Sequence, residues 1–482
     1  MLLSNKERRD IGLDYVFEKL QIMTPYGEKR QNLKKLYRPG EEEELKAELE
    51  AILLFTEELS NKAYPLHQVQ YEFCRVKDIS ASINRANRGA ILDEVELFEI
   101  KGFSRVVSEL DKKLSGLRLP PAFELVNLDH VEELLDPDRS GLLTFYIYDS
   151  YSEELTRLRE EKKILEEEIF RASLDKREEL LGKRGQLVLL EEEEERRIRK
   201  DLSQKIGSEA KSFFINMEAI GRLDHWIAKA KLARDYRFCR PELSLDMLVE
   251  LEGASIPMVE DLLKRSMVVF QPLSISLKPG TTLVTGANMG GKSVSLKTLV
   301  LNVLLVHLGF LPFASKMKLS LMDFVFYMGD DQEDLRSGLS SFGAEVIKLR
   351  DILKRTKIEK GLIVLDEPAR GTNPKEGRAI VKGLAQQFLE KDSILLLATH
   401  FDQVVEPGMV HYQIRGLEGV DFEKLKEGFE FKEEKSLDLL RSKMDYRLER
   451  VEGDREVPKD ALRICRLLGL DRELIEIINQ LL

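Results

Sequence analysis

The sequence predicts a multidomain protein with an α-helical N-terminal core and a long helical arm, followed by an α/β domain around a phosphate-binding loop and by C-terminal helices. Two observations predict this order. Residues 1–240 place apolar side chains at helical spacing among many charges. Beyond them, three short apolar runs end in residues suited to phosphate or metal. We expect boundaries near 150, 240 and 420, which give the parts 1–150, 151–240, 241–420 and 421–482.

Composition bounds the class of protein. With 482 residues, 43% apolar and 33% charged, the chain can bury several cores. Its apolar stretches are too short or interrupted for a spanning helix, so no membrane partner is expected. The cysteines, Cys74, Cys239 and Cys465, form neither a metal-ligand spacing nor an even disulfide set. The start MLLSNKERRD lacks an apolar signal region, which favours a reducing, cytoplasmic location.

The N-terminal core is predicted to be helical. Residues 41–63 and 91–115 each place leucine and isoleucine on one helical face, with acidic side chains in the first turn of 41–63. The runs of glutamate are typical of a solvated face. Phe55-Thr56-Glu57 lies in the first of these helices, where we expect Phe55 to face the core.

The arm is predicted from residues 151–200, which are rich in both acidic and basic side chains and poor in helix breakers. We expect a turn at 181–185, Leu-Gly-Lys-Arg-Gly, between two antiparallel helices of roughly 30 residues, each ~45 Å long. Lys183 and Arg184 would then lie at the tip. Basic residues there can contact a nucleic-acid backbone, but at a turn they are more often solvent-exposed and inert.

The phosphate-binding loop is the most informative feature. The run 281–285, TTLVT, predicts a strand, and 294–310 predicts a helix, with GANMGGKS at 286–293 between them. Its glycines leave successive backbone N–H groups free to turn inward, and the helix presents its positive end to an anion. The lysine would reach the outer phosphates and the serine hydroxyl would ligate Mg²⁺. The residues assigned to this site are Gly286, Gly290, Gly291, Lys292 and Ser293.

Two further strands end in candidate catalytic residues. The first, in GLIVLDEPARGT at 361–372, ends in Asp366, expected to hold Mg²⁺, and Glu367, expected to act as general base for an attacking water. The second, SILLLATH at 393–400, ends in His400, which would orient that water or sense the terminal phosphate. Taken singly, polar residues such as these are also common where an ordinary strand ends. Their occurrence together with the upstream phosphate-binding loop favours a catalytic role.

Together these motifs resemble the ATPase domain of the MutS family, which is related to ABC-type ATPases. The resemblance rests on GANMGGKS, LDEPARGT, LLLATHF and GDDQEDLRSGLSSFGAEV at 329–346. It implies ATP and Mg²⁺ as cofactors and places Asn288 and Met289 in the nucleotide loop. It also implies that Ser340 reaches the partner's terminal phosphate across a dimer interface and that Gln332 or its acidic neighbours lie near the attacking water and the metal. The dimer would be a homodimer or a heterodimer with a MutS-like paralogue.

The resemblance extends outside the catalytic strands. It makes 151–240 a lever arm with a shortened clamp and 421–482 a helical dimerisation segment. Three positions depart from the family pattern: Val294 follows the loop serine, Pro368-Ala369 replaces Xaa-Gly, and Ile256 stands where the family has histidine. The last change puts in doubt any contact that the turn around Ile256 would make with the base or ribose of the nucleotide.

The client of the ATPase is left open. One hypothesis is a MutS-type clamp on double-stranded DNA in mismatch repair or recombination. A net charge of −11 weakens it, although a dimer can line an internal ring with a few lysines. The alternative is a protein-remodelling ATPase that reactivates a cobalamin-dependent lysine 5,6-aminomutase, because 8–30 resembles the start of short MutS-like proteins associated with that enzyme. A nucleotide-binding scaffold with little or no hydrolysis is the third hypothesis.

Overall fold

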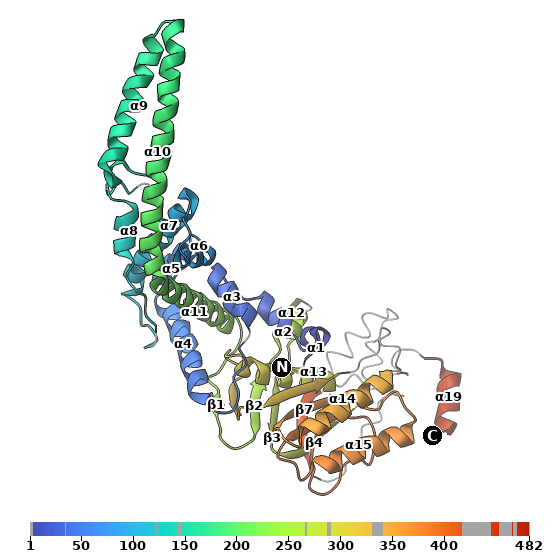
Figure 1. Ribbon diagram of the computed structural model, residues 1–482. Coiled ribbons are helices and arrows are strands. Elements are labelled where there is room, and N and C mark those ends of the chain that lie inside the picture. The colour runs from blue at the N-terminus through green and yellow to red at the C-terminus, as the bar shows by residue number, and fades with distance from the viewer. Residues whose placement is uncertain are drawn as a thin grey trace. The chain divides into compact units, whose positions relative to one another are not determined.

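The protein is mixed helical with β-sheets (Figure 1). The computed structural model describes residues 3–33, 35–121, 123–141, 146–265, 268–286, 291–329, 341–416, 445–452, 465 and 470–481. The chain divides into two compact units: residues 1–20, 35–53 and 231–482 form one, and residues 21–34 and 54–230 form the other. The four-part division drawn from the sequence stays a prediction.

The second unit is helical in its described part, as the apolar periodicity indicates. Phe55 is completely buried and stacks on Trp226 with ring centroids 6.2 Å apart, so Phe55 faces the core as expected. The helices of this unit are α3 (Pro25–Leu33), the end of α4 (Glu42–Asn61), α5 (Ala63–Phe73), α6 (Ser80–Asn87), α7 (Glu94–Leu114), α8 (Asp129–Leu135), the short η1 (Asp149–Tyr151), α9 (Glu153–Arg171), α10 (Leu174–Ser208) and most of α11 (Ala210–Asp235).

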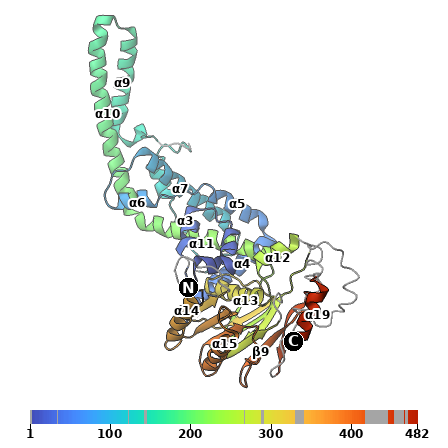
Figure 2. The ribbon, with the colours of Figure 1, turned by 90° about the vertical axis from the view of Figure 1, so that its right-hand side faces the viewer.

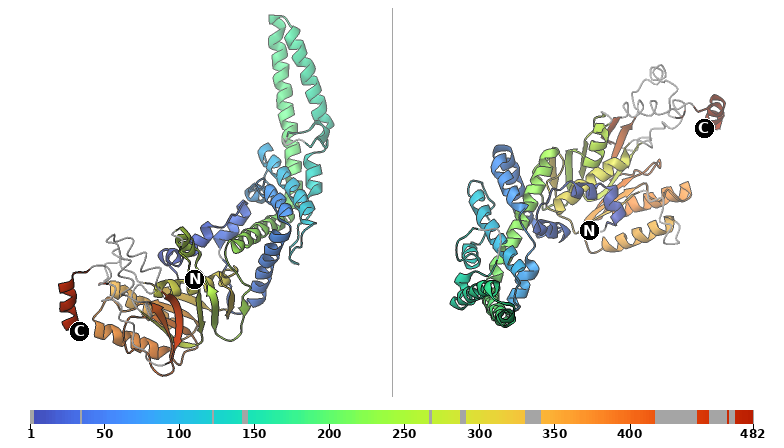
Figure 3. Two further views of the ribbon diagram at one scale, coloured as in Figure 1. Left: turned by 180° about the vertical axis from the view of Figure 1, so that it is seen from behind. Right: turned by 90° about the horizontal axis from the view of Figure 1, so that it is seen from above.

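Helices α9 and α10 form the antiparallel arm and lie side by side in every view (Figures 1, 2 and 3). The turn predicted at 181–185 is wrong, since α9 ends at Arg171 and α10 begins at Leu174. Lys183 and Arg184 are therefore inside α10, where they pair at 2.8 Å with Glu179 and Glu166 respectively. Exposed glycines within a helix cost only ~1 kcal/mol each, so they do not force a turn where ion pairs and packing continue.

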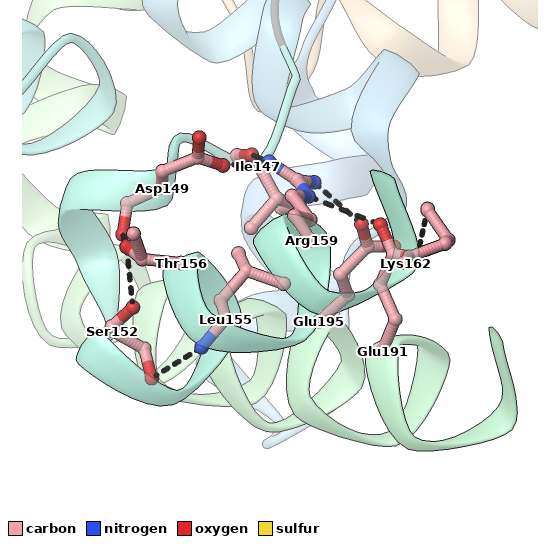
Figure 4. Close-up of polar contacts among 9 residues, drawn as sticks. All are labelled: Ile147, Asp149, Ser152, Leu155, Thr156, Arg159, Lys162, Glu191 and Glu195. Atoms are coloured by element: carbon pink, nitrogen blue, oxygen red, sulfur yellow. Dashed lines mark hydrogen bonds and ion pairs between the residues drawn. The ribbon is translucent and has the colours of Figure 1, made fainter. Parts of the chain in front are cut away.

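An ion-pair network fastens α9 to α10 away from the turn (Figure 4). The Arg159 guanidinium donates to the carbonyl oxygen of Ile147 at 2.8 Å and pairs with Glu195 at 2.7 Å and Glu191 at 3.1 Å. Ser152 caps α9 by accepting a hydrogen bond from the Leu155 amide at 3.4 Å. A planar guanidinium satisfies several acceptors at once, so this network holds the helix register where the apolar contact is thin.

The first unit contains a mostly parallel sheet whose described strands lie in the order β10-β9-β4-β8-β7-β6. Only β10 in this set runs antiparallel to its neighbour. Strands β4, β6, β7 and β8 are buried along their whole length, which is the pattern of a parallel sheet covered on both faces. The strands are β4 (Gly280–Thr285), β6 (Phe324–Met328), β7 (Gly361–Asp366), β8 (Ile394–Ala398), β9 (Val410–Gly416) and β10 (Asp445–Val451).

Helices cover this sheet on its two faces. Helices α14 (Ser341–Arg355) and α15 (Pro374–Phe388) lie side by side on one face and share an apolar core with Leu283, Ile363 and Leu397 (Figure 1). Helix α13 (Lys292–His307) packs against β6, β7 and β8 and also against β2 and β3 of a second sheet. Its leucines are buried all round because it lies between two sheets.

The second sheet has the strand order β1-β5-β2-β3 among the described residues. Its strands are β1 (Glu242–Leu243), β2 (Val249–Ala254), β3 (Leu273–Leu277) and β5 (Lys316–Leu319), and helix α12 (Pro257–Arg265) follows β2. The N-terminal helices α1 (Asn5–Asp10) and α2 (Leu13–Glu18) belong to the same unit. The Tyr15 hydroxyl donates to Asp261 of α12 at 2.7 Å, so the N-terminus is fastened to the unit that carries the phosphate loop.

The C-terminal part differs from the helical expectation in one element. Strand β10 pairs with β9 and so extends the large sheet, whereas only helices were expected in 421–482. This strand, DYRLERV, is only half-buried and rich in charged residues, so its sequence shows little of the apolar alternation that predicts a strand. Helix α19 (Arg472–Leu481) follows. None of the helices in the described ranges is long and apolar enough to cross a bilayer.

Candidate functional site

The sheet register brings three strand ends into one row. Val284 of β4 lies opposite Ala398 of β8, and Ala398 lies opposite Asp366 of β7. The carboxyl ends of neighbouring parallel strands meet at one edge of the sheet, where α/β proteins place their ligands. Three segments that are well separated in the sequence therefore deliver Lys292, the carboxylates Asp366 and Glu367, and His400 to the same edge.

Four of the predicted loop residues are described. Gly286 has φ 146° and Gly291 has φ 86°, so both adopt backbone conformations that side chains disfavour. Gly291 caps the N-terminus of α13, and Lys292 and Ser293 form its first turn. This is the arrangement in which backbone N–H groups and the helix dipole favour an anion. Asn288, Met289, Gly290, Gln332 and Ser340 lie outside the described residues, so their assignments stay predictions.

Lys292 and Glu367 form the centre of the site. The Lys292 ammonium, whose side chain is 4% exposed, donates to the carbonyl oxygen of Gly286 at 2.7 Å and lies 3.3 Å from Glu367 Oε1. On the other side of Glu367, Oε2 lies 3.6 Å from His400 Nδ1 and 3.5 Å from the Arg370 guanidinium. The structure thus brings the predicted base, the predicted histidine and the phosphate lysine together.

Glu367 leaves the strand in an unusual backbone conformation. Its φ is 48°, in the left-handed region, and its amide donates to the Ala398 carbonyl oxygen at 3.0 Å. A non-glycine residue costs about 1–2 kcal/mol there, and such strain clusters at functional sites. The His400 imidazole is the largest cause that lowers the pKa of Glu367 to about 2, and Lys292 adds to the effect against the opposing burial. Glu367 is therefore ionised at neutral pH.

Asp366 differs sharply from its neighbour. It is buried, and burial raises its pKa, with the charge of Glu367 adding to the rise. The Ser293 side chain hydrogen-bonds to it and lowers the pKa, as do the cations Lys297 and Lys292. Oδ1 of Asp366 has no hydrogen-bond partner among the described residues. A buried carboxylate oxygen in this state is suited to a cation, because an unpaired buried acceptor is costly.

These residues fit Mg²⁺ bound with a nucleotide. Mg²⁺ is held in such sites by one or two protein oxygens, with phosphates and waters completing its shell. Ser293 and Asp366 supply one hydroxyl and one carboxylate oxygen. The described part of the chain contains no cluster of three or more histidine, cysteine or acidic side chains that could hold a metal ion.

Several residues of the site were missed by the sequence analysis. Arg370 contacts Glu367, and the Glu345 carboxylate of α14 accepts a hydrogen bond from the Ala369 amide at 2.6 Å. Ala369 has φ 61°, which gives a physical reason for the glycine that the family has there. Ile256 is completely buried, so its departure from the family histidine serves the core. Nothing in the structure explains Val294.

Replacement of Gly291 by alanine should damage the loop. The added Cβ would lie 2.7 Å from Cδ1 of Tyr446, at a φ of 86° that alanine disfavours. We expect a loss of about 1–2 kcal/mol in the free energy of unfolding, together with weaker nucleotide binding. Urea unfolding and nucleotide titration measure the two effects.

Gly383→Ala on α15 is the matched control, because nothing lies within 4 Å of the Cβ that it adds. It should stabilise the fold by up to ~1 kcal/mol. If Gly291→Ala behaves like this control in both assays, the described loop geometry is wrong.

Comparison with known proteins identifies the family. MutS domain V matches residues 282–444, which contain the loop lysine, both carboxylates and His400. Through this domain the chain is similar to the MutS family. It is 30% identical to Endonuclease MutS2 of Caldanaerobacter subterraneus over 295 residues, which is 60% of the chain and 34% of that protein. It is 34% identical to Endonuclease MutS2 of Thermus thermophilus over 44% of the chain and 27% of that protein.

A third relative, Endonuclease MutS2 of Levilactobacillus brevis, is 31% identical over 44% of the chain and 27% of its own length. The chain thus matches about a third or less of the length of these curated relatives. The resemblance drawn from the motifs is confirmed at the level of the family.

Proposed function

We propose that this chain binds and hydrolyses ATP with Mg²⁺ as one subunit of a dimeric switch that acts on double-stranded DNA. The observation that carries the ATPase part is the convergence of Lys292, Ser293, Asp366 and Glu367 at one edge of the sheet, with an unpartnered oxygen on Asp366. Members of the MutS family are ATPases, which supports the same conclusion.

Each residue has a distinct task in this mechanism. Lys292 moves from the Gly286 carbonyl oxygen to the outer phosphates, while Ser293 and Asp366 would hold Mg²⁺. When bound, Mg²⁺ would neutralise phosphate charge. Glu367, ionised by its cationic neighbours, accepts a hydrogen bond from the attacking water and aims it at the terminal phosphate. His400, the largest cause that lowers the Glu367 pKa, stays beside it when Lys292 turns to the phosphates, so the carboxylate remains ionised.

His400 and Arg370 keep the Glu367 carboxylate in place. Both lie within 3.6 Å of the same oxygen, Oε2, whereas Lys292 faces Oε1. Oε2 therefore stays beside His400 and Arg370, whereas Oε1 becomes free to accept a hydrogen bond from water once Lys292 binds phosphate. By resemblance, Ser340 of the second subunit closes over the nucleotide, and closure shifts the population between two dimer states that differ in the arms.

DNA is the client that the comparisons favour. The relatives are named as endonucleases, a class that acts on nucleic acid, and the matched part includes domain V. We do not propose that the chain cuts DNA, because it matches only about a third of the length of these endonucleases. No described residue and no relative favours the aminomutase client, so that alternative remains a hypothesis from the sequence alone.

The test measures ATP hydrolysis by the purified chain with and without duplex DNA while NaCl is raised from 50 to 200 mM, the range over which phosphate contacts lose about 10³–10⁵ in affinity. We expect DNA to stimulate hydrolysis at low salt and the stimulation to disappear at high salt, with basal hydrolysis little changed. Hydrolysis indifferent to DNA at every salt concentration excludes the DNA part, and absence of any hydrolysis excludes the ATPase part.

A further inference from the structure

The N-terminal helix α1 contacts the element that carries the phosphate loop. Residues 1–20 belong to the same compact unit as α13, although nearly 300 residues separate them in the sequence. Asp10, the last residue of α1, places Oδ1 at 2.6 Å from the Lys297 ammonium of α13. Its other oxygen, Oδ2, accepts a long hydrogen bond of 3.5 Å from the Tyr327 hydroxyl of β6.

Both partners of Asp10 lie next to the metal edge of the site. Lys297 follows Ser293 by four residues on α13, so the two side chains share one face of the helix. Tyr327 lies opposite Val364, two residues before Asp366 on β7. Asp366 acts electrostatically on the Tyr327 hydroxyl, and Lys297 acts on Asp366. The region therefore contains a carboxylate oxygen of Asp366 without a hydrogen bond among the described residues and, on neighbouring elements, a cation and a hydroxyl that both contact Asp10.

Asp10 is not needed to fasten the N-terminal segment. Asp261 of α12 accepts hydrogen bonds from Tyr15 of α2 at 2.7 Å and from Tyr236 at 2.6 Å. Glu7 of α1 pairs with Lys348 of α14 at 3.1 Å. The Asp10 side chain is 43% exposed, so its ion pair contributes little to folding. A role at the metal edge of the site therefore explains the contacts of Asp10 with Lys297 and Tyr327 better than a role in folding.

We propose that Asp10 is a positioning residue for the metal edge: it retains the Lys297 ammonium and the Tyr327 hydroxyl, so that Asp366 keeps an oxygen available for Mg²⁺. This inference rests on the proposed ATPase function. Without Asp10, the flexible Lys297 side chain turns toward Asp366 at the end of β7, and its ammonium occupies the place that the divalent cation would take. The N-terminal segment thereby sets how strongly nucleotide binding depends on Mg²⁺.

The test uses binding rather than turnover. The dissociation constant of a fluorescent ADP analogue is measured in Mg²⁺ and in EDTA. The value in EDTA divided by the value in Mg²⁺ gives the Mg²⁺ preference. We expect Asp10→Asn to lower this ratio by about tenfold, the size of effect seen when a residue that orients a metal ligand is removed. Affinity in EDTA should stay unchanged.

Two variants separate positioning from folding. Asp10→Asn combined with Lys297→Met removes the displaced ammonium and should restore the Mg²⁺ preference of the unmodified chain. Asp14→Asn, which removes the same charge from α2 but breaks a pair with Arg8 at 3.1 Å, should leave the preference intact. Thermal unfolding of each variant without nucleotide reports whether the fold is retained.

The outcomes are distinguishable. An unchanged ratio for Asp10→Asn, or a lowered ratio that Lys297→Met does not restore, overturns the role of Asp10. If Lys297→Met alone loses the Mg²⁺ preference, the role of Asp10 is overturned as well. In that variant no ammonium is left that could turn toward Asp366. If the unmodified chain binds no ADP analogue at all, the proposed function fails first and independently of Asp10.

Discussion

Lys292→Ala is expected to weaken ATP binding by ~10- to 150-fold, because the lysine is the cation that reaches the outer phosphates, and a charged hydrogen bond of this kind contributes ~1.5–3 kcal/mol. Its ammonium is already desolvated within the site. Equilibrium titration with a labelled ATP analogue measures the loss.

The variant should keep its fold. Glu367 retains His400 and Arg370 as neighbours, and Lys292→Met preserves the aliphatic stem as a second form of the same test. Lys382→Ala on α15 removes an equal charge from a surface pair with Glu406 at 2.7 Å and should bind normally. Tight ATP binding by folded Lys292→Ala protein would be fatal to the loop assignment.

Glu367→Gln is expected to bind ATP within about threefold of the unmodified chain and to lose ~10²–10⁴ in turnover, the range that a positioned acid–base group supplies. Glutamine has the same shape but cannot take up a proton from the attacking water. Single-turnover hydrolysis measures the rate, and light scattering with ATP measures the dimer, which should accumulate in its closed state. Undiminished turnover would remove Glu367 from its assigned role.

The pH dependence of Glu367 follows from its lowered pKa. A depressed pKa in the folded protein means that the charge stabilises the fold above the unfolded value of about 4.3 and that this contribution is lost as pH falls through about 2. Between pH 5 and 9 the carboxylate stays ionised, so we expect no acid limb from Glu367 in the hydrolysis rate over that range.

The sequence predicted the phosphate loop and the two later strand ends because each depends on short-range pattern. Buried parallel strands are continuous apolar runs, and β4, β7 and β8 begin and end close to where those runs do. The helical nature of the N-terminal part followed equally from periodicity. The turn of the arm did not, because Gly182 and Gly185 are exposed within a continuous helix and only packing against α9 decides where the chain reverses.

The sequence by itself determined the likeness to MutS domain V, the residue types at the strand ends and their expected chemistry, since motif spacing carries that information locally. Tertiary structure alone decided three matters. Strand register set Asp366 beside Ala398, the left-handed turn at Glu367 aimed its carboxylate at Lys292 and His400, and docking of α1 placed Asp10 on Lys297. Each depends on contacts between segments far apart in the chain, whose meeting is set by the packing of the whole unit.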